Sequence, residues 1–239
     1  MCGIHASISR DGPQPPSQDL KKLLCFRGPD YIGNTEDLVK SEGYTDYLSF
    51  TSTVLALRGD HVTTQPFVDQ SSGSVLCWNG EAWRFGSNLV GDRNDGEILF
   101  NLLVHAAATE KVEDATADVL KVLQTISGPF AFVFWDQAHH SLFFGRDRLG
   151  RRSLLHSITS SSIELSSTSD PGRGVWKEVE ADAIYRLSLS KDSAGNRLHS
   201  EAVHEQVCEY LSIAPYLVSK TSWEVDSESS VSVFFSCLY

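Results

Sequence analysis

The sequence predicts an α+β fold in which helices lie on a β-sheet. Segments rich in β-branched and aromatic residues, at 49–57 and 74–78, come in the first third of the chain and read as strands. Two amphipathic helices follow near the middle, and strand-like segments return after them. This order predicts a layered domain that combines sheet and helix rather than a purely helical one.

The first predicted elements are a short strand and a short helix. Residues 2–9 alternate as in a strand, and residues 12–16 contain the glycine and prolines that end it. Ser17 or Asp19 could then cap a helix, which would stop before Gly28.

The two central helices are predicted from capping residues and apolar spacing. Asn94 or Asp95 could cap the first helix, and the second is predicted over 114–126 with Gly128 as its stop. The apolar side chains repeat at helical spacing in both segments. They are Ile98, Leu99, Leu102 and Leu103 in the first helix, and Val119, Leu120, Leu123 and Ile126 in the second.

A hairpin of two almost uniformly apolar strands is predicted after the helices. FAFVFWD at 130–136 and SLFFGRD at 141–147 are separated by a turn at 137–140. Neither strand has a polar face, so both are predicted at the centre of the fold between layers. Further strands are predicted at 153–158, 163–167 and 183–189.

The strand and helix patterns define one domain over 2–190. Residues 191–239 are predicted to be a C-terminal extension that is partly ordered at best, because the pattern weakens there and the end of the chain is rich in serine.

Composition excludes several classes of partner and location. The formal net charge of −11 would repel the phosphates of a nucleic acid, so none is expected as a partner. No apolar window approaches the about 18 residues of a membrane span, and the N-terminus lacks an export signal. The five cysteines are widely spaced, which favours reduced thiols in a cytoplasmic protein.

Metal and cofactor sites are not expected. The sequence contains no CxxC motif and no histidine pair at zinc-ligand spacing. His5 is predicted to have a surface or packing role, because strand alternation directs residues 2 and 5 to opposite faces. His139 and His140 are predicted to form a solvated pair in the hairpin turn.

Cys2 is a candidate nucleophile because of its position directly after Met1. Removal of Met1 would leave a thiol one residue's reach from a free α-amino group with a pKa of about 7.7 to 8. One residue would then supply the nucleophile and its general base. On position alone, an ordinary buried cysteine at the start of a strand is the favoured interpretation.

Other polar residues could complete a site around this thiol. In WNGE at 78–81, the Asn79 amide and the Gly80 backbone N–H could stabilise one oxyanion, although spacing alone favours a hairpin turn there. Arg58 could grip a carboxylate, or it could be a surface charge. Asp95 could hold an ammonium group, or it could be a helix cap.

Seven short motifs, taken in order, resemble those of class II glutamine amidotransferases, and most closely the glutaminase domain of glutamine-dependent asparagine synthetases. The resemblance covers residues 2 to about 190. The motifs are MCGI at 1–4, RGPD at 27–30, TTQP at 63–66, WNGE at 78–81, NDGEILF at 94–100, GPFAFVFWD at 128–136 and FGRDRLGRRSLL at 144–155.

The resemblance implies a four-layer αββα sandwich of the N-terminal-nucleophile hydrolase type, with two packed, mostly antiparallel sheets flanked by helices. It also implies glutamine as the substrate and a γ-glutamyl thioester that releases ammonia. No cofactor is implied.

The resemblance assigns roles to six residues. Cys2 would be nucleophile and base, and Asn79 and Gly80 would form the oxyanion hole. The glutamine α-carboxylate would be held by Arg58, and its α-amino group by Glu81 and Asp95. Structural roles are implied for Gly3, for the pocket wall at 27–30 and for residues 145–147.

The sequence also departs from the asparagine synthetase pattern. Phe26 replaces the histidine before RGPD, Ser153 replaces a proline, and the connection from Arg58 to the TTQP motif is shorter. These differences make Arg58 the weakest assignment and leave a weakened glutaminase open.

The phosphate-gripping SGGxDS loop of the synthetase domain is absent from these 239 residues. Asparagine synthesis by residues 1–239 alone is therefore not expected, and the sequence is interpreted as ending before a synthetase domain. Three hypotheses remain: a glutaminase that releases ammonia freely or to a partner protein, a non-catalytic module that binds glutamine or a protein, and an amidase for another γ-glutamyl compound. The intact set of Cys2, Asn79, Gly80, Glu81 and Asp95 favours the first.

Overall fold

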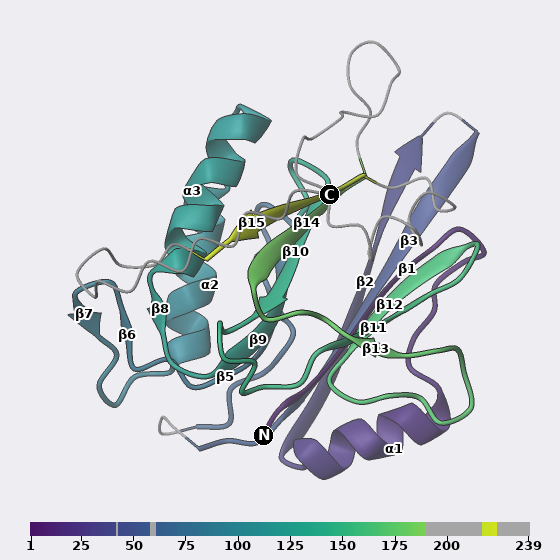
Figure 1. Cartoon of the computed structure of the whole chain (residues 1–239), viewed down its shortest axis with the longest axis horizontal. Helices are drawn as coiled ribbons and strands as arrows, with labels where there is room; N and C mark the ends of the chain where they lie inside the picture. Colours follow the sequence, from purple (N-terminus) through teal and green to yellow (C-terminus); the bar gives the residue numbers. More distant parts are fainter. Residues whose placement is uncertain (42, 58–60, 190–216, 224–239) are drawn as a thin grey trace, which may run out of the picture.

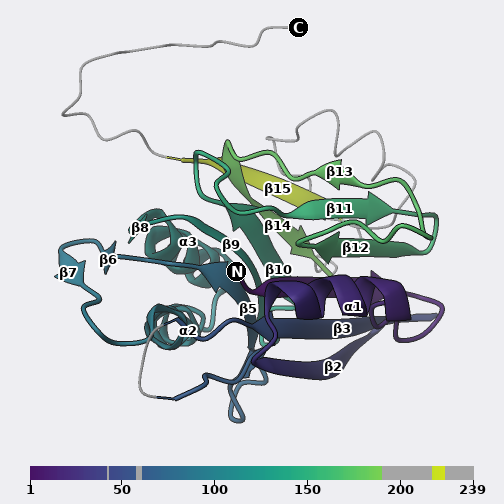
Figure 2. The same ribbon diagram turned by 90° about the horizontal axis from the view of Figure 1, so that it is seen from below.

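The described residues fold into four layers. The computed structural model describes residues 1–41, 43–57, 61–189 and 217–223. Two six-stranded sheets pack face to face, and helices cover the outer side of each (Figures 1 and 2). The predicted α+β sandwich with two antiparallel sheets is confirmed.

The first sheet contains the strand that follows Cys2. All its pairings between strands are antiparallel, and β1 lies between β12 and β3. Its strands, in spatial order, are β13 (Lys177–Glu178), β11 (Leu155–Ile158), β12 (Ser162–Ser166), β1 (Gly3–Ser9), β3 (Tyr44–Val54) and β2 (Tyr31–Ser41).

The second sheet contains the two predicted central strands. Its strands, in spatial order, are β15 (Leu217–Ser222), β14 (Ala183–Ser188), β10 (Ser141–Arg146), β9 (Phe130–Asp136), β5 (Val75–Gly80) and β4 (Phe67–Val68). A separate small sheet contains β7 (Asn88–Leu89), β6 (Arg84–Phe85) and β8 (Ile126–Ser127).

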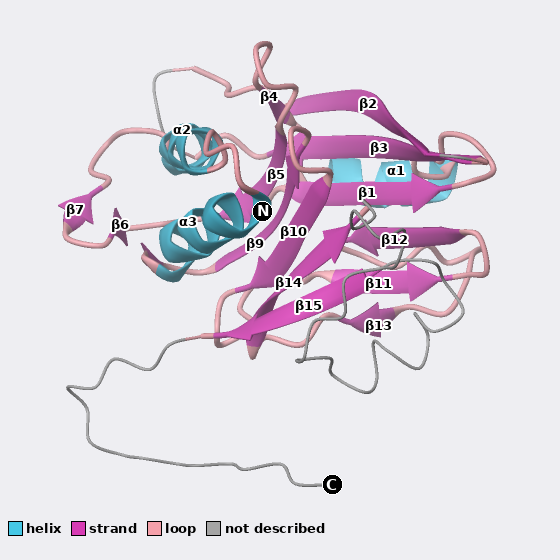
Figure 3. Cartoon of the chain, turned by 90° about the horizontal axis from the view of Figure 1, so that it is seen from above, coloured by secondary structure: helices cyan, strands magenta, loops and turns pink. Residues whose placement is uncertain are grey.

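The three helices form the outer layers. Helix α1 (Gln18–Arg27) covers the first sheet, and α2 (Asp95–Ala106) and α3 (Val112–Gln124) cover the second (Figures 2 and 3). Ser17 caps α1, because its Oγ accepts a hydrogen bond from the Leu20 N–H at 3.2 Å. The predicted end of the third helix at residue 126 is wrong, since Ile126 already belongs to β8 and hydrogen-bonds as a strand.

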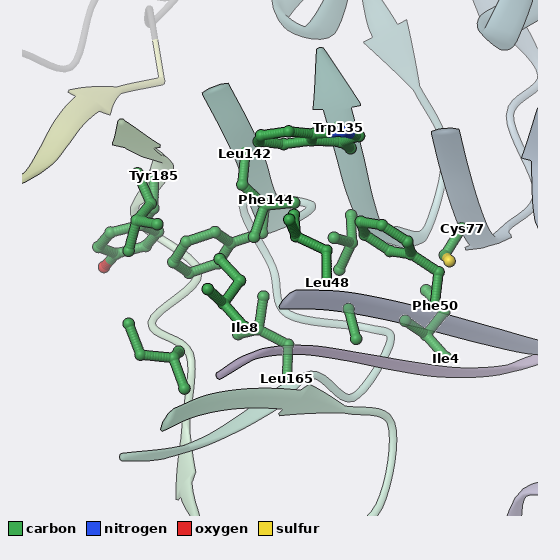
Figure 4. Packing of buried hydrophobic residues seen from close by; sticks show 14 of the residues in the cluster. Ile4, Ile8, Leu48, Phe50, Cys77, Trp135, Leu142, Phe144, Leu165 and Tyr185 are labelled. Atoms are coloured by element: carbon green, nitrogen blue, oxygen red, sulfur yellow. The ribbon is translucent and has the colours of Figure 1, made fainter. Parts of the chain in front are cut away.

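The main hydrophobic core lies between the two sheets (Figure 4). Side chains from β1 and β3 meet side chains from β5, β9, β10 and β14 across this layer. A second core lies between the second sheet and helices α2 and α3. Residues of β9 alternate between the two cores: Ala131, Val133 and Trp135 face the first, and Phe130, Phe132 and Phe134 the second. The central position predicted for β9 and β10 is therefore confirmed.

Strand β2 was not expected from the sequence. Residues 31–41 contain a glycine, an asparagine and several charged side chains, which are poor strand formers. All eleven residues nevertheless pair with β3, and the strand lies at the sheet edge with most side chains exposed or half-buried. A polar strand is tolerated there because only one of its edges is paired inside the sheet.

Part of the predicted C-terminal extension belongs to the second sheet. Leu217–Ser222 form β15, which pairs with β14 over six residues. The Trp223 ring then packs edge-on against Phe130, with ring centroids 5.9 Å apart. The rest of the extension, 191–216 and 224–239, lies outside the described residues.

Candidate active site

Five of the six predicted site residues line one cavity at the N-terminal end of β1. They are Cys2, Asn79, Gly80, Glu81 and Asp95. Cys2 immediately precedes β1, the Asn-Gly pair ends β5, and Asp95 begins α2. The start of the chain lies close to β5 in the views of Figures 2 and 3. The sixth residue, Arg58, lies outside the described residues.

The Cys2 thiol is fixed between the ends of β3 and α1. The Leu55 N–H points at Sγ over 3.5 Å, and Arg27 Nε donates a hydrogen bond to the Cys2 carbonyl at 3.2 Å. Gly3 allows this close approach, because a Cβ there would come within 2.5 Å of Thr53 Oγ1. The thiol is therefore held in place by packing and by neighbouring backbone groups.

The RGPD block ties α1 to β3 beside the thiol. A Cβ at Gly28 would come within 2.4 Å of the Thr53 carbonyl carbon, so this contact requires glycine. The Asp30 Oδ2 accepts a hydrogen bond from the Ala56 N–H at 2.8 Å. This block builds one wall of the cavity by holding the chain that follows β3.

Asn79 and Gly80 lie within a strand rather than in a turn. They pair with Ala131 and Phe130 of β9, so the hairpin-turn interpretation is wrong. Asn79 is only 1% exposed, and its Nδ2 has no hydrogen-bond partner among the described residues. A buried amide donor without a partner is costly, which is typical of a group that is satisfied when a ligand binds.

Asp95 holds the wall opposite the thiol. Its buried Oδ2 accepts hydrogen bonds from Trp78 Nε1 at 3.0 Å and from the Ala82 N–H at 2.7 Å. The cap of α2 is Asn94, whose Oδ1 accepts from the Glu97 N–H at 3.0 Å. The interpretation of Asp95 as a helix cap is therefore wrong, and its carboxylate places negative charge at the cavity.

The TTQP block positions the two motifs that face Cys2. Gln65 Oε1 accepts a hydrogen bond from the Trp78 N–H at 2.9 Å, and Thr63 Oγ1 accepts from Asn94 Nδ2 at 2.8 Å. The sequence identified this block as a motif without a role. In the structure it links the end of β5 to the start of α2.

Arg152 lines the same cavity and was not predicted as a site residue. Its Nη1 donates to the Met1 Sδ at 3.3 Å, and its Nη2 lies 3.9 Å from Glu81 Oε2. The available signal was its place in the GRDRLGRRSLL block, five residues after Asp147. Sequence distance alone does not show that this loop returns to the N-terminus.

Met1 occupies the mouth of the cavity. Its α-amino group donates a hydrogen bond to the Arg27 carbonyl at 3.3 Å, and burial lowers the pKa of this group. While Met1 is present, the Cys2 nitrogen is an amide and cannot act as a base. A free amine next to the thiol therefore requires removal of Met1.

The electrostatics of the cavity favour a protonated thiol at rest. Burial raises the pKa of Cys2, and the Asp95 carboxylate raises it further, while the Leu55 N–H, the terminal ammonium and Arg27 oppose this shift. Three buried donor atoms around the thiol lack a partner in the described residues. These atoms are Asn79 Nδ2, Arg27 Nη2 and Arg152 Nε.

The histidines within the described residues do not line the cavity. His5 is fully buried and its Nε2 lies 3.2 Å from Glu164 Oε2, which confirms a packing role. The prediction of a solvated pair in the turn is wrong for His139, which is 8% exposed with Nδ1 2.7 Å from Asp136 Oδ2. The partner carboxylate from β9 draws this ring inward.

The described residues contain neither a candidate metal cluster nor a helix that could cross a membrane. No group of three or more His, Cys, Asp or Glu side chains there could hold a metal ion. The helices in the same part of the chain are too short or too polar to cross a membrane.

The chain is similar to known glutamine-using proteins. Residues 1–207 match a protein family described as "Glutamine amidotransferase domain". Asparagine synthetase domain-containing protein 1 of Bos taurus is 37% identical over 202 residues, which are 81% of this chain and 29% of that protein. The Homo sapiens protein of the same name is 36% identical over 198 residues, covering 79% of this chain and 28% of that protein. The chain thus spans less than a third of the length of these relatives.

The fold is also found in solved structures. Glutamine phosphoribosylpyrophosphate amidotransferase from B. subtilis, complexed with ADP and GMP, aligns with a TM-score of 0.53 and 14% identity. The alignment covers 78% of this chain and 47% of that one. At this identity the likeness shows the fold alone.

Proposed function

Since the chain belongs to the class II glutamine amidotransferase domain family, we propose that it hydrolyses the side-chain amide of glutamine through Cys2 and releases ammonia. The single observation that supports this most strongly is the shared cavity of the Cys2 thiol and the buried, unpartnered Asn79 amide. Nucleophile and oxyanion donor are the two groups that acyl transfer needs first.

The first half of the reaction forms a thioester. After Met1 is removed, the Cys2 amine takes the thiol proton, and Sγ attacks the γ-carbonyl carbon of glutamine. The oxygen becomes an oxyanion that Asn79 Nδ2 and the Gly80 backbone N–H stabilise. The C–N bond then breaks as the Cys2 ammonium returns the proton to the leaving nitrogen, which departs as ammonia.

The second half restores the enzyme. Water attacks the γ-glutamyl thioester while the same amine accepts its proton, and the oxyanion forms again between Asn79 and Gly80. Collapse of this intermediate breaks the C–S bond, releases glutamate and returns the proton to the thiol. The reaction needs this base, because a cysteine thiol with an ordinary pKa of about 8.5 forms little thiolate at neutral pH.

Binding of the substrate's charged end uses the polar rim of the cavity. Glu81 and Asp95 hold the α-ammonium group in this proposal, and Arg58 holds the α-carboxylate. Buried Asp95 is supported by two hydrogen-bond donors, so its charge stays at a constant position.

The ammonia acceptor lies outside residues 1–239 in this proposal. The relatives carry asparagine synthetase in their names, so we place the activity next to an amide-forming partner in asparagine biosynthesis. A thiol nucleophile works only while it is reduced, which agrees with the cytoplasmic location predicted from the sequence.

The test is active-site labelling with a glutamine-analogue diazo-ketone. The purified protein should lack Met1 by mass spectrometry and should gain one adduct at Cys2. Cys25 is the matched control, since it is a second half-buried free thiol on α1. Cys2→Ala should lose both the adduct and the release of ammonia, whereas Cys25→Ala should keep both.

The outcomes separate the remaining hypotheses. A retained Met1, or no Cys2 adduct at saturating reagent, would contradict the glutaminase proposal and leave a binding module. Release of glutamate from glutathione but no ammonia from glutamine would instead identify an amidase for other γ-glutamyl compounds.

A further inference from the structure

We propose that Arg152 is a second substrate-binding residue, in addition to Arg58, and that it pairs with the α-carboxylate of the amino acid bound beside Cys2. This inference rests on the proposed function, and it gives a role to a residue of the FGRDRLGRRSLL motif to which neither the motif nor the comparisons assign one. It makes a free α-carboxylate, next to the α-ammonium group, the feature by which the cavity selects its substrate.

The Arg152 backbone is held in place by the preceding block. Arg146 Nε donates a hydrogen bond to the Arg152 carbonyl at 2.7 Å, and Arg146 Nη1 donates to the Val179 carbonyl at 3.0 Å. Asp147 accepts hydrogen bonds from the N–H groups of Leu149 and Arg151, each at 3.1 Å. The GRD block therefore fixes a loop whose last residue reaches the cavity.

The Arg152 side chain is only partly satisfied in the chain that retains Met1. In the described residues, its Nη1 donates a hydrogen bond to the Met1 Sδ, which is a weak acceptor. Its Nη2 forms a long ion pair with Glu81 Oε2 at 3.9 Å. Its buried Nε has no partner in the same set of residues, and the side chain is only 21% exposed. A largely buried guanidinium whose ion pair with Glu81 is as long as 3.9 Å, and whose Nε lacks a partner in the described residues, would be stabilised by a bound carboxylate.

Loss of Met1 opens this position. The thioether that contacts Nη1 leaves together with Met1, which lines the same cavity. The step that creates the catalytic amine therefore also frees the guanidinium for an incoming ligand.

The charge pattern matches an amino acid. Glutamine carries its ammonium and carboxylate groups on one carbon, and the Arg152 guanidinium and Glu81 carboxylate lie side by side at 3.9 Å. A planar guanidinium can bind a carboxylate through two parallel hydrogen bonds. The other end of the substrate can then extend toward Cys2 and Asn79, which line the same cavity.

The experiment compares L-glutamine with L-glutaminamide, in which the α-carboxylate is an uncharged amide. Arg152→Ala should lower kcat/KM for glutamine about 10- to 150-fold, the range of one charge-assisted hydrogen bond, mainly through KM. It should leave kcat/KM for L-glutaminamide within about twofold, because no carboxylate is present to lose its partner. Arg152→Lys should recover part of the loss, since lysine keeps the positive charge but lacks the planar guanidinium that can donate two parallel hydrogen bonds.

Arg148→Ala is the matched control. It removes an exposed positive charge from the same loop, outside the residues that line the Cys2 cavity, and should leave both substrates unaffected. The rate of Cys2 alkylation by iodoacetamide, which carries no carboxylate, should be the same in Arg152→Ala and wild type. That comparison shows that the site still folds.

Failure of this inference differs from failure of the proposed function. Equal losses for both substrates, or a shifted pH profile with unchanged KM, would overturn the carboxylate role and place Arg152 at the reacting groups. If the wild type releases no ammonia, the inference is tested by calorimetry, which measures the affinity of wild type and Arg152→Ala for glutamine. Binding that weakens in Arg152→Ala would keep the inference without turnover, and binding that does not change would overturn it.

Discussion

The two cysteines Cys2 and Cys77 show how different surroundings give one side chain two roles. Cys77 lies between the sheets, completely buried in the core shown in Figure 4, and burial raises its pKa to about 12. Cys2 is also largely buried and its pKa is raised, but it lines a cavity with Asn79 and Arg152. Burial alone makes a thiol inert, and the cavity beside Cys2 distinguishes the reactive thiol.

The surroundings of the two thiols differ in their access to a cavity. Around Cys77 lie apolar side chains such as Phe50 and Ile4, together with the Ser52 hydroxyl, whose hydrogen bond opposes the rise in the pKa of Cys77. Around Cys2 three donor atoms of the described residues lack partners. Unpartnered buried atoms of the described residues also occur within the sheets, such as Ser49 Oγ, so the feature that distinguishes Cys2 is the cavity that it lines together with Asn79 and Arg152.

The largest expected effect is at the thiol itself. Cys2→Ala should abolish release of ammonia from glutamine, because no other nucleophile replaces Sγ, while Cys77→Ala should keep kcat/KM within about threefold. Ammonia production measured at saturating glutamine tests both variants. Activity in Cys2→Ala, or its loss in a folded Cys77→Ala, would reverse the assigned roles.

The next effect concerns the oxyanion donor. Asn79→Ala should lower kcat about 100- to 1,000-fold with little change in KM, as for loss of one such donor in other enzymes. Steady-state kinetics with glutamine provide the measurement. Because Asn79 Nδ2 has no partner in the described residues, the variant should unfold at nearly the wild-type temperature. A large loss of stability with unchanged kcat would instead identify a structural amide.

The reactivity of the thiols should also depend differently on pH. In protein that retains Met1, the raised pKa of Cys2 keeps the thiol protonated at neutral pH. Its alkylation rate by iodoacetamide should therefore rise about tenfold per pH unit from pH 7 to 8.5, since the thiolate fraction grows with pH below the pKa. Cys77, with a pKa of about 12, should stay unmodified over this range. A rate at Cys2 that is already constant at pH 7 would contradict the assigned shift.

The smallest effect is on the stability of the core. Cys77→Ala should lower the free energy of unfolding by about 1 to 2 kcal/mol, because it removes one buried atom from a close-packed layer. Urea denaturation measures this value, and Cys2→Ala should change it less. An equal or larger loss in Cys2→Ala would mean that the cavity thiol is a packing residue.

Local patterns predicted those parts of the fold whose burial is uniform. The apolar runs of β9 and β10 identified the centre of the sandwich, and Ser17 identified the start of α1. Strand β2 was missed, because its polar sequence forms a strand only through its pairing with β3. The turn at Asn79-Gly80 was wrongly favoured for the converse reason: its pairing with β9 outweighs the local preference of Asn-Gly.

The candidate site was likewise predicted only in part from the sequence. The motifs and their family order by themselves indicate Cys2, Asn79, Gly80, Glu81 and Asp95. Arg152 could not be identified from its neighbours in the chain, since its contacts are with Met1 and Glu81. The buried partner of His139 was also missed, because an i, i+3 carboxylate in a hairpin turn can equally well lie in solvent.

By itself the sequence determined the class of the fold, the family and the identity of the candidate nucleophile, because these depend on side-chain patterns and on motif order. Only the tertiary structure decided that Asn79 is a buried strand residue whose Nδ2 has no partner in the described residues, and that Arg152 lines the cavity of Cys2, 150 residues away in the chain. Hydrogen bonding and burial between distant segments are properties of packed sheets and loops. They leave no local pattern in the sequence from which they could be predicted.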